Sequence, residues 1–459
     1  MATRAREPSA RGAAAIAVIF AFALLVVVSF LGTERESWNT RAAVFVLPVV
    51  FFGSLPAFAR QARREGQPRL FTFLILALSV KLLFSFFRWY HAFYVVNGAD
   101  AVGYDREGWE IASRFLRGDF TMGLEGIYDT NFIRLLTGSI YTVIHPTSLG
   151  GFLIYAWLAF WGTYLFYRAF VIAVPQGNRR SYARWLFFMP SILFWPSSIG
   201  KESWLIFGLG IAAFGAARLL TGRFVPGLVI TGIGLALTSM VRAPIAVVFG
   251  VALIVAGIVR RQRREGQRMP FLARLATIAV FALAGLVLYT VMQGFLVRSG
   301  FASTGVEGAV VQAGRVTDTG GSEFDPVAVT SPVGLAVASV TVLFRPFPFE
   351  ANNAEALVTS IEAVVLMLLS IVRYRSILAA LRAFRRVPYT LVAFLYVGGS
   401  ILALAPVANF GIIARQRVLI FPMWLVLVCF LAREPAAPSR ARSAVRYDRA
   451  APSLVGSRT

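Results

Sequence analysis

The sequence is poor in the residues that build redox and metal sites. Its 459 residues include one cysteine, Cys429, and two histidines, His91 and His145. A single cysteine excludes an internal disulfide, and neither histidine has cysteine or carboxylate neighbours at metal-ligand spacing. The sequence therefore predicts no zinc, haem or redox centre.

Charged residues are scarce as well, and acidic ones most of all. They make up 15% of the chain, with 22 Asp and Glu against 45 Lys and Arg, and the only lysines are Lys81 and Lys201. The net charge of +23 has the sign that nucleic acid attracts, but the arginines lie between apolar runs too long to face water. Membrane topology explains the charge better, and no nucleic-acid partner is expected.

What the chain has in abundance is apolar length. Hydrophobic residues make up 58% of it and come in long blocks rather than at amphipathic spacing. A bilayer core needs about 20 apolar helical residues per crossing, so the sequence predicts an all-α polytopic membrane protein with about twelve transmembrane helices. The expected spans are 12–31, 42–59, 70–87, 152–172, 185–198, 203–220, 224–241, 244–259, 272–296, 355–372, 388–406 and 416–432.

Charge asymmetry gives the expected orientation. With a cytoplasmic N-terminus, the inner segments carry 28 arginines against five acidic residues, whereas acidic and basic residues nearly balance in the outer segments. This is the bias of the positive-inside rule, so both termini are expected in the cytoplasm. Residues 1–432 form one transmembrane domain in this interpretation, and 433–459 form a disordered, basic cytoplasmic tail.

Two of the outer loops, 88–151 and 297–354, are longer than a connection requires. Long loops in a compact protein are usually functional. Each loop contains an apolar stretch, 132–145 and 333–344 respectively, that is too short to cross a bilayer. We expect these stretches to form short interfacial helices at the outer leaflet.

Several basic residues next to the spans fall on the outer side, against the topological bias. The segment PSSIGKES carries Lys201 in a tight turn, with a solvated turn capped by Ser197 or Ser198 as the plain alternative. The other outer cations are also explained by snorkelling at the interface. Together they suit the phosphate or pyrophosphate of a lipid carrier. The predicted phosphate-binding set is Lys201, Arg242, Arg345, Arg415 and Arg417.

Acidic residues gather in the first long loop, in GADAVGYDREGWEIASRFLRGDF. From Asp105 the pattern is D-x3-W-x2-A-x3-L-x-G, and apolar residues at that spacing form one face of a short helix. A carboxylate is thereby held at the helix start, above the membrane. The simpler interpretation of Asp105 is an ordinary solvated loop acid.

This carboxylate-led helix resembles the first-loop signature of the GT-C superfamily of integral-membrane glycosyltransferases, and PSILFWPSSIGKES is similar to their P-x4-S-S turn. The resemblance implies a sugar donor carried on polyprenyl phosphate, entering from the outer leaflet, and an acceptor that is a cell-envelope glycan. Asp105, or Asp100, would be the general base, with the outer cations on the departing phosphate. Tyr104 and Trp109 would stack on the sugar, although interfacial aromatics also form membrane belts. A divalent cation bridging Asp105, Glu107 and the phosphate stays open.

Two rival functions remain at this point. An O-antigen-type polysaccharide polymerase, using pyrophosphate-linked repeats, would depend on the outer arginines more than on Asp105. A lipid flippase or transporter would use ionisable residues inside spans, such as Glu362, with Lys81 as its partner. In each case we expect a bacterial plasma-membrane protein.

Overall fold

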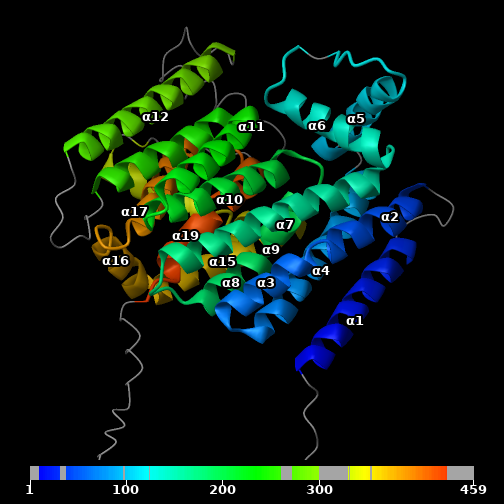
Figure 1. Cartoon of the computed structure of the whole chain (residues 1–459), viewed down its shortest axis with the longest axis horizontal. Coiled ribbons are helices and arrows are strands. Elements are labelled where there is room, and N and C mark those ends of the chain that lie inside the picture. The colour runs from blue at the N-terminus through cyan, green and yellow to red at the C-terminus, as the bar shows by residue number, and fades with distance from the viewer. Residues whose placement is uncertain are drawn as a thin grey trace, which may run out of the picture.

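The computed structural model describes residues 10–31, 38–96, 99–123, 125–259, 271–298, 329, 331–351 and 354–431. Within these residues the elements are helices, and an isolated β bridge pairs Gly177 with Phe430 (Figure 1). The expected all-α fold is confirmed. The predicted tail 433–459 and much of the loop 297–354 lie outside the described residues.

Twenty-two helical segments, several of them only one turn long, build the described part of the chain. The first half contains α1 (Ala10–Leu31), α2 (Trp38–Phe52), α3 (Leu55–Glu65), α4 (Pro68–Tyr90), η1 (His91–Val96), α5 (Asp100–Leu116), α6 (Thr130–Ile144), α7 (Ser148–Ala173), α8 (Arg179–Phe188), α9 (Pro190–Phe194) and η2 (Trp195–Ser197). The second half contains α10 (Lys201–Leu220), α11 (Phe224–Val259), α12 (Phe271–Arg298), α14 (Pro332–Phe344), η4 (Pro348–Glu350), α15 (Ala354–Val372), α16 (Tyr374–Arg382), α17 (Pro388–Leu404), α18 (Phe410–Gln416), η5 (Arg417–Leu419) and α19 (Phe421–Val428).

The chain is a multi-pass membrane protein, but the expected count of twelve spans is wrong. Among the described residues, six helices are long and apolar enough to cross a membrane, or up to seven if the pair α18–η5 and α19, bent by 63°, counts as one. Proline explains one loss, because Pro190 and Pro196 break the expected span 185–198 into α8, α9 and η2. Other expected spans are shorter helices, such as Pro388–Leu404.

Helix α11 counts as one of the six but has a break in its middle. Arg242 is non-helical, with φ −142° and ψ 89°, at the residue where the sequence predicts an outer turn. The first half lies along α10, where a Cβ on Gly208 would come within 2.7 Å of Thr238. The second half packs on α17, with the rings of Phe249 and Tyr396 5.5 Å apart. The two halves therefore contact different neighbours.

Glycines let the central helices approach one another closely. A Cβ on Gly162 of α7 would come within 2.2 Å of the Ile206 carbonyl of α10, and one on Gly210 within 2.3 Å of the Gly162 carbonyl. Small residues at such crossings allow backbone-to-backbone packing where lipid removes the usual hydrophobic drive between helices. Larger side chains at either position would force α7 and α10 apart.

The broken segment α9 is held by two buried charged residues. Glu362 of α15 accepts from the backbone N–H of Ser191 at 3.0 Å and from its hydroxyl, and Lys81 of α4 donates to the Ile192 carbonyl at 2.7 Å. Backbone groups exposed by a helix break must find partners inside a membrane protein. Lys81 and Glu362 therefore stabilise α9. The expected ion pair between these two side chains is not among the ion pairs of the described residues.

Helix α4 has 23 residues and so extends over about 34 Å. It runs between two ends of the molecule, which we name by the helices they contain. The α5–α6 end holds α5, α6 and the starts of α7 and α10, as Figure 1 shows. The α8 end holds the α3–α4 turn and α8. The last described residue, Leu431, also lies there, since its N–H bonds to the Gln176 carbonyl. The short helices expected in the long loops are present as α6 and α14.

Candidate functional site

An ion-pair cluster at the α5–α6 end is centred on Arg415, in the last turn of α18. Its Nη1 lies 2.7 Å from Asp100 Oδ2, at the start of α5, and its Nε lies 2.7 Å from Glu202 Oε1, in the first turn of α10. The Glu202 side chain is only 3% exposed, whereas that of Asp100 is 59% exposed. Arg415 thus joins three segments that are far apart in the sequence.

A second chain of polar contacts runs beside this cluster. The Arg88 Nη1 lies 3.0 Å from His91 Nδ1, and His91 Nε2 lies 2.9 Å from Glu355 Oε1. The Arg88 guanidinium also stacks on the rings of Phe194 and Trp195, at 4.6 and 5.2 Å from their centroids. Its Nε is buried and has no hydrogen-bond partner among the described residues. One buried donor at this end is therefore left for another group.

An amphipathic cavity of about 370 Å³ opens at the same end. Its polar end is formed by Asp129, Lys201, Arg242 and Gln416, and Lys201 Nζ lies 2.8 Å from Asp129 Oδ1. The remainder is lined mainly by aliphatic and aromatic side chains from α11, α12, α17 and η5, together with Ser400. The cavity therefore presents two cations at one side and apolar walls along the rest.

Asp105 lies in a neighbouring hollow of about 450 Å³, lined also by Arg106, Trp109 and Tyr141. It accepts a hydrogen bond from the Tyr141 hydroxyl, and it forms no ion pair in the described part of the chain. Burial raises the pKa of Asp105 to about 6, although the Tyr141 hydrogen bond opposes the rise. Asp105 is thus set up to exchange a proton near neutral pH.

Asp100 has the opposite electrostatic setting. Partial burial acts to raise its pKa, but the hydrogen bond and charge of Arg415 outweigh that effect and hold the pKa of Asp100 below its usual value. A carboxylate held ionised in this way is a weak base. Of the two predicted general bases, Asp105 is therefore the better suited to accept a proton.

Tyr141 connects the hollow with the turn that carries Lys201. A Cβ on Gly151, in the first turn of α7, would lie 2.7 Å from the Tyr141 hydroxyl and 2.8 Å from the side chain of Ile199. Ile199 is two residues before Lys201. Asp105 and Lys201 accordingly lie at the same end of the molecule, linked through Tyr141 and Ile199, which both approach Gly151.

The structure groups some of the predicted residues and separates others. Lys201 and Arg242 share the amphipathic cavity, and the charges of Arg242 and Arg415 both act on Glu202. Arg417 is fully buried, and its Nη1 donates to the Arg345 carbonyl at 2.6 Å. That contact gives Arg417 a structural role, and its predicted binding of phosphate stays a prediction.

Arg345 and Tyr104, whose predicted phosphate and sugar contacts stay predictions, make contacts within the protein. Arg345 is paired with Glu350 and stacks 4.7 Å from the centroid of Phe410. The ring of Tyr104 is 6% exposed and packs in the core, whereas Trp109 is 55% exposed beside Asp105. Trp109 is therefore the stacking candidate with an open ring.

Three residues of this end were not singled out from the sequence. Arg88 could have been found because a charge within an apolar span is a functional candidate by default. Asp129 comes three residues before the helix expected at 132–145, close to where an acidic residue caps a helix. Tyr141 carried no signal, since a tyrosine in an apolar helix is ordinary.

A metal site has no support in the described residues. They contain no group of three or more His, Cys, Asp or Glu that could hold a metal ion. Glu107, the expected second ligand, pairs with Arg134 instead. The proposed bridge between Asp105 and Glu107 thus has one of its carboxylates engaged elsewhere.

No protein-family model, no curated protein and no solved structure matches this chain. Membership of the GT-C superfamily accordingly stays a prediction that depends on the sequence motifs alone.

Proposed function

We propose that this protein transfers a sugar from a polyprenyl-phosphate carrier to a cell-envelope glycan acceptor at the α5–α6 end. The carrying observation is the amphipathic cavity, where Lys201 and Arg242 lie at one side of apolar walls. A polyprenyl phosphate has the same division between an anionic head and a long apolar tail. The phosphate would bind the two cations, and the tail would lie along α11 and α17.

The acceptor hydroxyl would be activated in the hollow beside the cavity. Its oxygen attacks the anomeric carbon of the donor, the bond from that carbon to the phosphate oxygen breaks, and the hydroxyl proton passes to Asp105. A carboxylate in this role contributes about 10² to 10⁴ in rate. Trp109 provides an exposed ring beside Asp105 for a sugar face.

The leaving phosphate takes the electron pair of the broken bond and so gains negative charge. Lys201 and Arg242 offset that charge at the polar end of the cavity. Arg415 and Glu202 position the start of α10, from which Lys201 extends. Asp100 balances Arg415 rather than taking the proton.

A polysaccharide polymerase is the second candidate, and the number of cations at this end favours it. Arg88, Lys201, Arg242 and Arg415 lie in or beside the cluster, and a pyrophosphate has more oxygens to engage than a monophosphate. In that reaction the leaving group would be a polyprenyl pyrophosphate.

In either case we place the protein in the bacterial plasma membrane with the α8 end in the cytoplasm. The segments 60–69, 175–184, 218–223 and 373–386, all assigned to the inner side by their arginines, fall at this end. Orientation by the positive-inside rule would then put the reaction at the outer face.

Incubation of the purified protein with two radiolabelled donors tests the proposal. One donor carries its sugar on polyprenyl phosphate, and the other carries an oligosaccharide on polyprenyl pyrophosphate. Consumption of the first supports the transferase, and consumption of the second alone supports the polymerase. Consumption of neither by folded protein, with a mixed glycan acceptor present, contradicts both.

A further inference from the structure

The α8 end contains a cavity that plays no part in the proposed reaction. It has a volume of about 560 Å³ and lies between the start of α4, the end of α7 and helix α8. Gly66, with φ 63°, ends α3 in the left-handed region that glycine takes without strain, and Pro68 starts α4 two residues later. This sharp connection forms one wall of the cavity.

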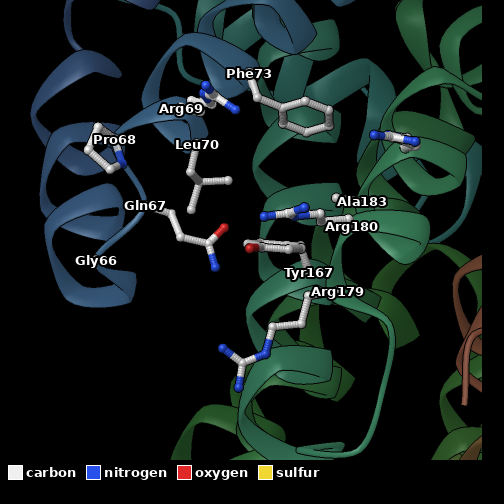
Figure 2. A pocket seen from close by; sticks show the side chains of 11 residues that line it. Gly66, Gln67, Pro68, Arg69, Leu70, Phe73, Tyr167, Arg179, Arg180 and Ala183 are labelled. Carbon is white, nitrogen blue, oxygen red and sulfur yellow. The ribbon is translucent and has the colours of Figure 1, made fainter. Parts of the chain in front are cut away.

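Four arginines line this space, namely Arg69, Arg179, Arg180 and Arg184. Figure 2 shows Arg69 on the α4 side and Arg179 and Arg180 on the α8 side, with the ring of Tyr167 beside Arg180. Arg180 and Arg184 are four residues apart on α8, and so they share a helix face. Guanidinium groups thus approach the cavity from two different helices.

None of these four guanidiniums forms an ion pair within the described structure. No Asp or Glu in the described ranges lies within ion-pair distance of any of them. The nearby Glu65 instead accepts from the Tyr167 hydroxyl, at 2.9 and 3.0 Å, and from Gln61. Like charges gathered with no acid in direct ion-pair contact repel one another, so a bound anion would stabilise this arrangement.

The remaining walls are apolar and belong to a membrane span. Leu70 and Phe73 line the cavity and lie in the first turns of the span Pro68–Val96. Phe73 packs edge-on against Phe187 and Phe188 of α8, with ring centroids 5.9 and 5.5 Å apart. The cavity therefore lies where a helix enters the lipid, with cations on the water side and aromatic side chains below them.

We propose that this cavity binds the phosphate headgroup of an anionic membrane lipid. Guanidinium groups bind phosphate oxygens in a bidentate fork, and basic pockets between membrane helices suit lipids with one or two phosphates. The acyl chains would follow Phe73 and α4 into the bilayer.

Topological bias alone does not account for this geometry. The positive-inside rule requires arginines in the loops of one side, but it does not require four of them around one hollow. Further cavities at this end are also arginine-lined, and one of them shares Arg180 and Arg184 with Arg373. The lipid headgroup would therefore lie on a broader basic surface.

Lipid titration of the purified full-length protein, followed by native mass spectrometry, tests the proposal. The probes are cardiolipin, phosphatidylglycerol and phosphatidylcholine, with inorganic pyrophosphate as a soluble competitor. The cavity variant is Arg180→Gln with Arg184→Gln. The matched control is Arg60→Gln with Arg63→Gln, which removes the same charge from exposed positions of α3 that do not line the cavity.

We expect the cavity variant to bind cardiolipin at least about tenfold more weakly than the unchanged protein, since two charge-assisted contacts are lost. The control should change binding less than about twofold, and phosphatidylcholine should bind none of the three proteins measurably. Equal losses in both variants would mean that only general surface charge acts, and would overturn the proposal. Pyrophosphate binding as tight as cardiolipin would overturn the lipid as the ligand.

The result of this test depends neither on a folding defect of the variants nor on sugar transfer. Arg180 and Arg184 are exposed at the cavity mouth, so their replacement leaves the core intact, and gel filtration checks each variant. A single change, Arg184→Glu, offers a second variant that should weaken cardiolipin binding further by repulsion. The readout is lipid binding, so it is independent of the reaction proposed at the other end.

Discussion

The two ends of this protein use positive charge in different ways. At the α5–α6 end, Arg415 is paired with two acids, Lys201 with Asp129, and Arg134 with Glu107. At the α8 end, the arginines around the cavity have no acidic partner in the described ranges. The ion pairs of the first end position segments of chain around the cavity that holds Lys201 and Arg242, whereas the arginines of the second end have only a ligand from outside to bind.

The difference also separates stability from binding. A buried charge must keep its partner, because an uncompensated charge in a dry interior is costly. Replacing an exposed arginine changes the free energy of unfolding little. We therefore expect substitutions at the α5–α6 end to affect folding or catalysis strongly, and substitutions at the α8 end to affect lipid binding alone.

The largest effect should come from Asp105→Asn. If Asp105 is the general base, its loss lowers the sugar-transfer rate by about 10² to 10⁴, because the amide cannot accept the hydroxyl proton. The measurement is kcat with a radiolabelled polyprenyl-phosphate sugar. Asp100→Asn is the matched variant, and it should lower the rate far less. Equal rates for Asp105→Asn and the unchanged protein, with Arg415→Ala inactive, would favour the polymerase.

The next largest effect concerns the buried pair. Arg415→Ala leaves Glu202 buried without its partner, and breaking such a pair costs about 3 to 5 kcal/mol in the free energy of unfolding. Denaturant unfolding in detergent measures this change. Arg184→Ala, an arginine of the other end, is the control and should stay within about 0.5 kcal/mol. Similar losses in both variants would remove the distinction between the two ends.

A pH profile gives an intermediate effect. Because burial raises the pKa of Asp105 to about 6, the carboxylate form needed for catalysis is lost as the pH falls through that value. We expect kcat/KM to drop about tenfold per pH unit below it. The pKa of Asp100 is held low by Arg415, so Asp100 stays ionised over the same range. A flat profile from pH 7 to 5 would contradict the assignment of Asp105.

The length of the apolar runs predicted some helices of this fold correctly and others not. The spans expected at 152–172 and 203–220 match α7 and α10 within a few residues. The span expected at 185–198 failed, because prolines 190 and 196 break the run and its backbone is bonded to Lys81 and Glu362, more than 100 residues away. Hydropathy measures composition and does not detect such long-range partners.

The candidate site shows the same limit at the level of single residues. Arg415 and Arg417 are two positions apart in one motif, and both were predicted to bind phosphate. The structure turns Arg415 to Asp100 and Glu202, and it buries Arg417 against a carbonyl 72 residues away. A helix places neighbouring side chains in different directions, and only the packing decides which of them meets an acid.

Lys201→Met should have the smallest effect on stability. It should nevertheless weaken binding of the donor clearly. Its pair with Asp129, whose side chain is 61% exposed, is worth about 0 to 1 kcal/mol, so the free energy of unfolding should change by less than about 1 kcal/mol. If the Lys201 ammonium binds the donor phosphate, KM for the polyprenyl-phosphate sugar should rise about tenfold or more. Arg180→Met is the matched change at the other end and should leave KM unaltered. A rise in KM for both would mean that the protein attracts its donor by total charge, and the paired cations would then hold no special place in the reaction.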